Sequence, residues 1–275
     1  MDILSTATPQ SLFFEEYYKD PILYKAYTES RWKYYGIPDQ QNDWIFFGDL
    51  LFQYSQGKSK DVSVLDLGCG YGRILRPLRQ LGFFVDGVDQ VPSMSQYANN
   101  TVSGKGACTS ANICCDELFG PYDVMIASFD LVNHLQVGEI QAALTNCRKY
   151  LKREGLLIID AINPTPSLMT AVCAEYQKPV LDSIFINPCT KCRNIVLQKR
   201  RYDYCTQRLT LEKNFLTEDR EESKAVNLSF HIYFPDELTA YVKRSGYEVE
   251  KFYGDFGGEE LSSYSQKMLL VCKKS

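Results

Sequence analysis

The residues with the clearest chemical meaning form a short glycine-rich segment. An apolar run ends in Asp66 and is followed by Gly68, Gly70 and Gly72 at alternate positions, ahead of a stretch with helical spacing. Glycines at such a turn let the backbone approach a ligand closely. The G-x-G-x-x-G spacing of dinucleotide sites fails here in both registers. Because the carboxylate of Asp66 would repel phosphates and attract a cation, we expect a ligand that carries positive charge.

A second acid, Asp89, ends the next apolar run. It lies about 20 residues after Gly68, and an acid near that distance binds ribose hydroxyls in nucleotide-binding folds. No Lys or Arg directly follows Asp89 to bind a 2′-phosphate, so the sequence favours NADP as the ligand even less than NAD. The two acids together predict a nucleoside ligand without a phosphate chain.

The elements that must position these acids alternate between short apolar runs and longer amphipathic ones, which is typical of βαβ units. We expect strands at residues 62–66, 83–89, 124–128 and 156–160, with a weak one near Cys108, and helices at 72–81, 93–102 and 137–151. Strands that are apolar almost throughout indicate a sheet covered by helices on both faces. The sequence therefore predicts an α/β fold with a Rossmann-like, doubly wound, mostly parallel sheet.

The rest of the chain divides around this core. Residues 1–60 are rich in aromatics and predict a helical cap of short helices interrupted at Pro21, Gly36 and Pro38, with a helix at 43–54 leading into the sheet. The core would cover residues 61–163. The alternation stops there, and 195–215 with 225–234 favour an antiparallel β lid within 164–234. Residues 235–275 should return to the core with a helix at 236–245 and closing strands at 247–252 and 267–272.

The acid followed by G-x-G-x-G resembles the first motif of class I S-adenosylmethionine-dependent methyltransferases. Softer matches lie at 122–124, 131–135 and 151–156, so that the resemblance spans roughly residues 62–163 together with the closing hairpin. It implies S-adenosyl-L-methionine as the cofactor, whose sulfonium and ammonium suit the expected charge. The implied cofactor-binding residues are Asp66, Gly68, Cys69, Gly70, Tyr71, Gly72, Asp89, Gln90, Met94, Asn112, Ile113 and Ser128.

One position departs from the family pattern. The family often has an acid after the third strand, where it accepts a hydrogen bond from the adenine amine. Here Asn112 is the best candidate, since its side-chain carbonyl can accept the same hydrogen bond. Asp116 is the alternative.

The candidates for catalysis are few, because the chain has 2 histidines. Methyl transfer from a sulfonium depends mainly on alignment, so a general base is optional. His134, at the start of a predicted helix, is placed by the resemblance at the cofactor end of the cleft, with a packed or capping role as the alternative. Tyr17 or Tyr18 in the cap should close over the methionine end, with simple hydrophobic packing as the alternative.

His231 belongs to a run in which Asn227, Ser229, His231 and Tyr233 alternate with apolar residues, so these four should share one polar face of a lid strand. Such a face meets either water or substrate, and water is the default. We therefore treat His231, His134 and Tyr18 as the candidate catalytic residues.

Charge and cysteine content narrow the class of protein further. Lys and Arg number 30 against 34 Asp and Glu, a net charge of −4, which argues against a nucleic-acid partner. The longest apolar runs fall far short of the roughly 20 residues that cross a bilayer, and the first residues do not resemble a secretory signal, so we expect a cytoplasmic protein without a membrane partner. In that compartment the 10 cysteines should stay free thiols. Cys189 and Cys192 have a metal-site spacing but lack a second pair, so we expect no metal.

The resemblance therefore implies a small-molecule methyltransferase that modifies N or O and uses S-adenosyl-L-methionine. An enclosed aromatic pocket under a lid suits a small acceptor. Three alternatives stay open on the sequence: a regulatory module that binds the cofactor without turnover, a thiol or metalloid methyltransferase, and a protein methyltransferase. The sequence does not identify the acceptor or the oligomeric state.

Overall fold

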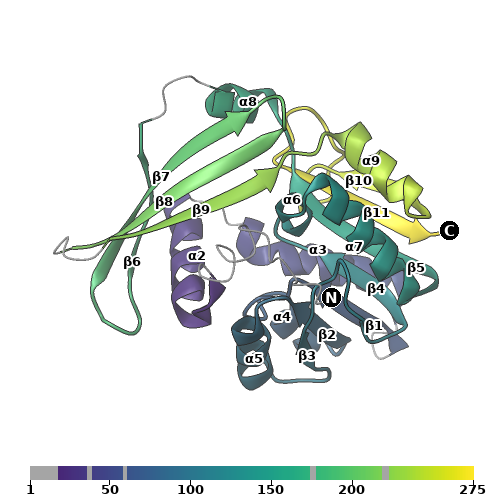
Figure 1. Cartoon of the computed structure of the whole chain (residues 1–275). Helices are drawn as coiled ribbons and strands as arrows, with labels where there is room; N and C mark the ends of the chain where they lie inside the picture. The colour runs from purple at the N-terminus through teal and green to yellow at the C-terminus, as the bar shows by residue number, and fades with distance from the viewer. Residues whose placement is uncertain (1–17, 36–38, 58–60, 174–177, 219–222) are drawn as a thin grey trace, which may run out of the picture.

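A seven-stranded sheet forms the core of the computed structural model, which describes residues 18–35, 39–57, 61–173, 178–218 and 223–275 (Figure 1). Its strands run in the order β10-β11-β5-β4-β1-β2-β3. The bounds are β1 Ser63–Leu67, β2 Phe84–Asp89, β3 Cys108–Ser110, β4 Tyr122–Ala127, β5 Leu151–Ile162, β10 Tyr247–Tyr253 and β11 Lys267–Lys274. The first five are parallel to one another, while β11 pairs antiparallel with both β5 and β10. The carboxyl ends of β1, β2 and β4 therefore meet at one edge, where ligands bind in such sheets.

Helices cover both faces of this sheet. They are α3 Asp39–Tyr54, α4 Leu75–Gln80, α5 Pro92–Thr101, α6 Leu131–His134, α7 Val137–Lys149 and α9 Pro235–Arg244. One apolar cluster joins α7 and α9 to one face, and a second joins α3, α4 and α5 to the other. In β1, Leu65 belongs to the first cluster and Val64 to the second. Side chains on both faces of one strand are thus buried, which explains its unbroken apolar sequence.

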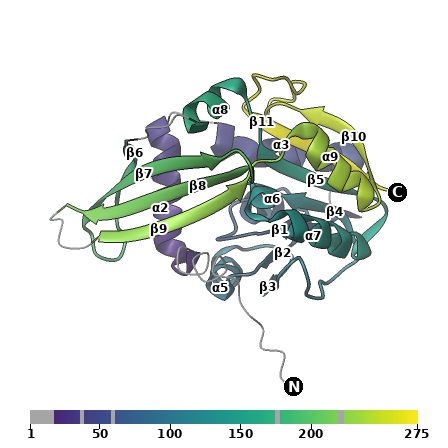
Figure 2. The same cartoon turned by 45° about the horizontal axis from the view of Figure 1, so that its top comes forward.

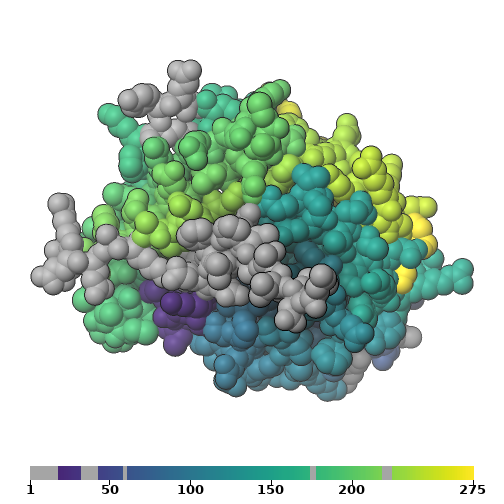
Figure 3. Space-filling model, in the orientation of Figure 1, coloured from purple at the N-terminus to yellow at the C-terminus, as the bar shows by residue number. Residues whose placement is uncertain are grey.

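A second sheet lies apart from the core and is reached after β5 (Figures 1 and 2). This lid sheet is antiparallel in the order β6-β7-β8-β9, with β6 Val180–Ile186, β7 Arg193–Asp203, β8 Arg208–Thr217 and β9 Ser223–His231. Helix α8 (Pro166–Cys173) precedes it, and helix α2 (Pro21–Tyr35) packs on β6. Tyr27 of α2 is buried with Phe185 and Val196 of the lid sheet. In the space-filling view, α2 in purple lies between the green lid strands and the blue surface of the core (Figure 3).

Buried polar contacts also hold α2 against the lid sheet. The Tyr27 hydroxyl donates to the carboxylate of Asp182 on β6, which is fully buried. Arg31 Nε lies 3.1 Å from Asp182 Oδ1, and Lys213 Nζ lies 3.6 Å from its Oδ2. A buried carboxylate is stable only with such partners. Helix α2 and the lid sheet therefore pack together as one unit, although they are far apart in the sequence.

The predicted fold class is confirmed, including the closing antiparallel hairpin and the β lid after the fifth strand. Several predicted bounds were wrong. Pro21 begins α2 rather than interrupting it, because a proline at the first helical position loses no hydrogen bond. Strand β5 begins at Leu151, where it pairs with Tyr122, and β6 was missed altogether. Gly36 and Pro38 lie outside the described residues.

Candidate active site

The loop between β1 and α4 folds back through two glycines with different surroundings. Gly70 has φ +52° and Gly72 has φ +85°, a region that L-residues with a side chain rarely adopt. A Cβ atom at Gly72 would lie 2.5 Å from Cγ2 of Val102, so this glycine lets α5 pack closely on the loop. A Cβ at Gly70 would meet nothing within 4 Å. Gly70 therefore faces open space, and a ligand can come close to its backbone.

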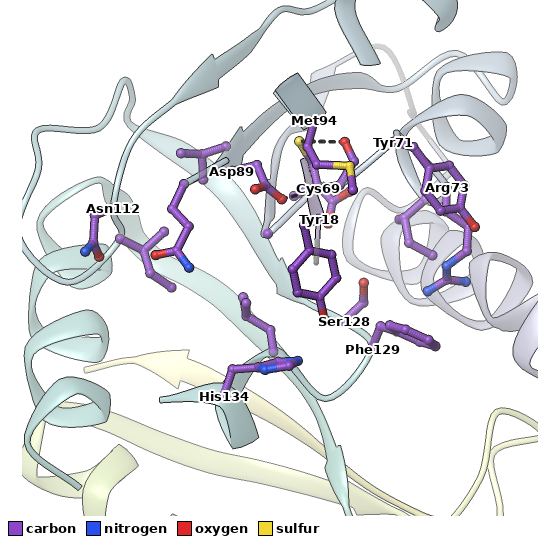
Figure 4. A pocket seen from close by; sticks show the side chains of 18 of the residues that line it. Tyr18, Cys69, Tyr71, Arg73, Asp89, Met94, Asn112, Ser128, Phe129 and His134 are labelled. Atoms are coloured by element: carbon purple, nitrogen blue, oxygen red, sulfur yellow. Dashed lines mark hydrogen bonds between the residues drawn. The ribbon is translucent and has the colours of Figure 1, made fainter. Parts of the chain in front are cut away.

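That open space is part of a cavity of about 370 Å³ at the carboxyl ends of β1, β2 and β4. Its described lining includes most of the site residues predicted from the sequence (Figure 4). The predicted residues on the lining are Tyr18, Asp66, Gly68, Cys69, Gly70, Tyr71, Asp89, Gln90, Met94, Asn112, Ile113, Ser128 and His134. Gly72 and His231 are not part of this described lining, and Tyr17 lies outside the described residues.

Asp89 is held in place by two backbone amides. Its Oδ2 accepts a hydrogen bond from the Gly70 amide at 2.8 Å, and its Oδ1 accepts one from the Val91 amide at 2.9 Å. Burial raises the pKa of Asp89, and these two hydrogen bonds oppose the rise by stabilising the carboxylate. Each oxygen keeps a further lone pair, so the carboxylate can accept two more hydrogen bonds from the cavity.

Asp66 is 1% exposed, and its Oδ1 has no hydrogen-bond partner among the described residues. Burial raises the pKa of Asp66 well above its usual range, and the charge of nearby Arg73 opposes the rise only in part. A buried acceptor without a partner is costly, because it has lost water and gained nothing. Since Asp66 lines the cavity, a cationic or hydrogen-bonding ligand there would supply the missing partner.

Asn112 lines the opposite side of the cavity from Arg73, with Tyr18 between them (Figure 4). Its Oδ1 accepts a hydrogen bond from the Cys114 backbone amide at 2.9 Å, and its backbone amide donates to Asp116 Oδ2 at 2.7 Å. The side-chain carbonyl thus shapes the turn after β3 and keeps one lone pair for a ligand. Asp116, the alternative acceptor, is absent from the described lining of the cavity.

His134 ends helix α6 and lines the cavity. Burial, and then the charge of Lys213 in the lid sheet, lower the pKa of His134 to about 4. Its ring lies 4.5 Å from that of Phe230 in β9 and 6.3 Å from that of Tyr18, measured between centroids. His134 is therefore a neutral imidazole at pH 7, able to accept a proton or a hydrogen bond.

Aromatic rings enclose the end of the cavity at which His134 lies. Tyr18 packs edge-on against Tyr24 with ring centroids 4.6 Å apart, and Tyr24 packs in the same way against Tyr71 at 6.1 Å. Burial raises the pKa of the Tyr24 hydroxyl, which is therefore un-ionised at neutral pH. Thr28 and Tyr24 of α2 were not predicted as site residues. Their aromatic-rich context was the only sequence signal that could have found them.

His231 does not face this cavity. Its Nε2 lies 3.3 Å from Glu237 Oε1 at the start of α9, its ring packs 4.3 Å from that of Tyr233, and its side chain is 5% exposed. The expectation that Asn227, Ser229, His231 and Tyr233 share one face of a strand fails for Tyr233, because β9 ends at His231. Asn227 is exposed, whereas Tyr233 is buried and donates to the Leu135 carbonyl.

The turn after β4 supplies a part of the site that the sequence did not indicate. Phe129 and Asp130 both have positive φ, +57° and +59°, and Phe129 lines the cavity. The Phe129 amide donates to Asp160 Oδ2 at 2.9 Å. Lys267 Nζ lies 2.9 Å from Asp130 Oδ1 and 3.1 Å from Asp160 Oδ1. Such backbone strain persists only where its surroundings enforce it, and here a buried lysine and two acids do so.

Neither a metal centre nor a membrane segment is built into the described part of the chain. Cys189 and Cys192 are exposed around the turn between β6 and β7. The described residues contain no group of three or more His, Cys, Asp or Glu side chains that could hold a metal ion. No described helix combines the length and apolar character needed to cross a bilayer.

A protein-family model described as a methyltransferase domain matches residues 64–155, which run from β1 into β5. Residues 64–155 form a methyltransferase domain. The matched range contains the glycine-rich loop, Asp89, Asn112 and His134. The resemblance to class I S-adenosylmethionine-dependent methyltransferases is thereby confirmed for this domain.

Curated relatives match the same part of the chain. A ubiquinone biosynthesis O-methyltransferase of Rickettsia akari is 34% identical over 135 residues, which is 46% of this chain and 51% of that protein. One of Cereibacter sphaeroides, strain ATCC 17029, is 31% identical over 124 residues, or 42% of this chain and 48% of that protein. The chain therefore spans about half the length of the curated relatives it matches.

Similarity to a solved structure extends beyond the methyltransferase domain. One such structure is that of CalS10, an amino pentose methyltransferase of Micromonospora echinaspora solved with S-adenosylmethionine bound. The match covers 100% of both chains, with a TM-score of 0.65 and 15% identity. At this identity the likeness concerns the fold alone.

Proposed function

We propose that the methyltransferase domain binds S-adenosyl-L-methionine and that the protein transfers its methyl group to N or O of a small molecule. The observation that carries this proposal is the single cavity that brings together the glycine loop, the acid of β2 and the aromatic wall of α2. The family match supports the cofactor, and the relatives' names, which include a ubiquinone biosynthesis O-methyltransferase and an amino pentose methyltransferase, support a small-molecule acceptor.

The cavity residues suit this cofactor along its length. The remaining lone pairs of Asp89 accept hydrogen bonds from the ribose hydroxyls, and the open backbone at Gly70 lets the ligand approach. The partnerless oxygen of Asp66 suits the cationic methionine end. Asn112 and Ile113, after β3, lie at the side proposed for adenine. When bound, the cofactor supplies a methyl group on a sulfonium, which is already activated for transfer.

The chain itself then positions the acceptor and supplies one proton-accepting side chain. His134, neutral at pH 7, accepts a proton from the acceptor's attacking group when that group has one to lose. Tyr18, Tyr24 and Phe129 surround this end of the cavity and exclude water, which fixes the acceptor in line with the methyl group. His231, covered by α9, instead supports the contact between the lid sheet and the core.

The compartment and the class of partner are part of the same proposal. All ten cysteines are free thiols, which suits a reducing, cytoplasmic environment. The net charge of −4 provides no field to attract nucleic acid. We therefore infer a small-molecule acceptor and no nucleic-acid partner.

Calorimetry with S-adenosylmethionine, S-adenosylhomocysteine and NAD tests the cofactor. The first two should bind, and NAD binding of comparable strength would contradict the proposal. Incubation with methyl-labelled cofactor and a metabolite extract tests the activity, since label should enter the small-molecule fraction. Binding without any labelled product would favour the regulatory module, and label confined to protein would favour a protein methyltransferase. Activity restricted to thiol or metalloid acceptors would favour the third alternative.

A further inference from the structure

Two thiols lie together beneath the glycine loop. Cys69 stands between Gly68 and Gly70, and Cys108 begins β3; both are 5% exposed and belong to the same apolar cluster. A Cβ atom at Gly87 would lie 2.8 Å from Cys69 Sγ, so this thiol occupies the space that a side chain at Gly87 would fill. Gly87 is paired directly with Cys108 in the sheet. The missing side chain of Gly87 therefore lets the two thiols approach each other.

A buried arginine lies next to this pair. Arg79 is 6% exposed; its Nε donates to the Val85 carbonyl at 2.9 Å and its Nη1 to the Val102 carbonyl at 3.3 Å. Its Nη2 lies 4.0 Å from Cys108 Sγ. Among the described residues no carboxylate forms an ion pair with Arg79 within 4.0 Å. A buried cation without a counterion is costly, and a thiolate at Cys108 would offset that cost.

The protonation of the two thiols follows from these contacts. A hydrogen bond from Cys69, together with the charge and hydrogen bond of Arg79, lowers the pKa of Cys108 against the opposing effects of burial and of Asp86. The same hydrogen bond to Cys108, and burial, raise the pKa of Cys69 well above its usual range. The opposite pKa shifts favour Cys108 as the thiolate and Cys69 as the protonated thiol, whose Sγ lies 3.9 Å from the Gly70 carbonyl oxygen. A nucleophilic thiolate beside a second thiol is the arrangement of oxidisable cysteine pairs.

We propose that Cys69 and Cys108 form a peroxide-sensitive thiol pair whose disulfide distorts the cofactor loop. The Cys108 thiolate attacks one oxygen of hydrogen peroxide, the O–O bond breaks, and the departing hydroxide takes a proton to become water. The Cys69 thiol then attacks the resulting sulfenic acid, which releases a second water and leaves the disulfide. Overall, two thiols are oxidised and one peroxide is reduced to two waters.

The cofactor cavity controls access to the pair, because Cys69 is part of its lining. A ligand in the cavity would cover Cys69 and shield Cys108 behind it. A disulfide is only about 2.05 Å long, so its formation must draw Cys69 toward β3. The neighbouring Gly70 amide, which donates to Asp89, would move with it. Oxidation should therefore weaken cofactor binding, and bound cofactor should slow oxidation.

Mass spectrometry of the full chain treated with hydrogen peroxide tests the pair without reference to methyl transfer. A peptide that joins Cys69 to Cys108 should appear, and it should be absent in Cys69→Ser and Cys108→Ser. Cys272→Ser removes another buried thiol, in β11, and should leave the bond unchanged. If peroxide joins either cysteine to another residue, or neither is oxidised while exposed cysteines are, the proposal is wrong.

Two further measurements test the roles of Arg79 and of the cavity. In Arg79→Met, disulfide formation should reach the wild-type rate only at a higher pH, because the thiolate has lost its cation. An unchanged pH profile would contradict the role of Arg79.

S-adenosylhomocysteine should slow oxidation of the wild type about tenfold, as expected for a thiol whose reactivity depends on exposure. The oxidised protein should bind it at least about tenfold more weakly, with recovery in dithiothreitol. Unchanged binding by the disulfide form would overturn the proposed effect on the loop, whereas failure of even the reduced protein to bind would count against the proposed function instead.

Discussion

The amide of Gly70 donates a hydrogen bond of 2.8 Å to the carboxylate of Asp89, which joins the loop after β1 to the end of β2. The two residues, both predicted to bind the same ligand, are thus a single structural unit. Because the amide occupies only one lone pair of Oδ2, the carboxylate can hold the loop and a ligand at once. This relationship makes Asp89 the most direct test of the site.

Replacement of Asp89 by Ala should reduce affinity for S-adenosylhomocysteine at least tenfold, since it removes charge-assisted hydrogen bonds of about 1.5 to 3 kcal/mol each. The loss should be smaller for an analogue without ribose hydroxyls. His231→Ala is the control: it lies outside the cavity and should leave affinity within about a factor of three, even where stability falls. Calorimetry measures both, and the reverse pattern would place the nucleoside elsewhere.

Gly70 and Gly72 form a matched pair for separating binding from folding. Alanine costs about 1 to 2 kcal/mol at either position because both have positive φ. Gly72→Ala should cost more, since its Cβ would lie 2.5 Å from Val102, whereas a Cβ at Gly70 meets nothing within 4 Å. Urea unfolding should show this order. Gly70→Val should still fold but lose cofactor binding; a folded variant that binds normally would move the ligand away from the loop.

His134 should remain neutral down to about pH 4. With 2 histidines in the chain, its NMR signal can be assigned by comparison with His134→Gln. Its pKa in the folded protein is below the unfolded value of about 6.5, so the unfolded chain binds the extra proton between these values. This group therefore contributes stability above about pH 6.5 that is lost as the pH falls toward 4. An imidazole that titrates near pH 6.5 in the folded protein would contradict this environment.

Replacing Lys267 should lower the free energy of unfolding far more than replacing Lys273, although both residues lie on β11. Lys267 is 7% exposed between Asp130 and Asp160, so Lys267→Met leaves two acids without their cation and should cost roughly 3 to 5 kcal/mol. Adding Asp160→Asn should recover part of that loss. Lys273→Met removes a solvent-exposed pair with Glu154 and should change the unfolding midpoint little. Equal effects in urea would show that the buried cluster does not stabilise the turn at Phe129.

The sequence alone determined the cofactor half of the site, because the residues that build it are close in the chain. A buried strand, a glycine turn and a helix follow one another within residues 63–80, and their order fixes where the backbone is open. Asp89 ends the adjacent parallel strand, so its position beside Gly70 follows from the βαβ topology. The local pattern also predicted the lid sheet, since antiparallel strands alternate in polarity.

Only the tertiary structure decided which side chains lie opposite the cofactor half of the site. Alternation assigns side chains to two faces of a strand but does not say which neighbour covers each face, and so His231 lies against Glu237 of α9 while Phe230 packs on His134. Helix α2 brings Tyr24 to the cavity through its contacts with a lid sheet more than a hundred residues away in the chain. Lys267 meets Asp130 for the same reason: burying one charge requires its partner wherever the chain can supply it, and no local signal marks that partner in advance.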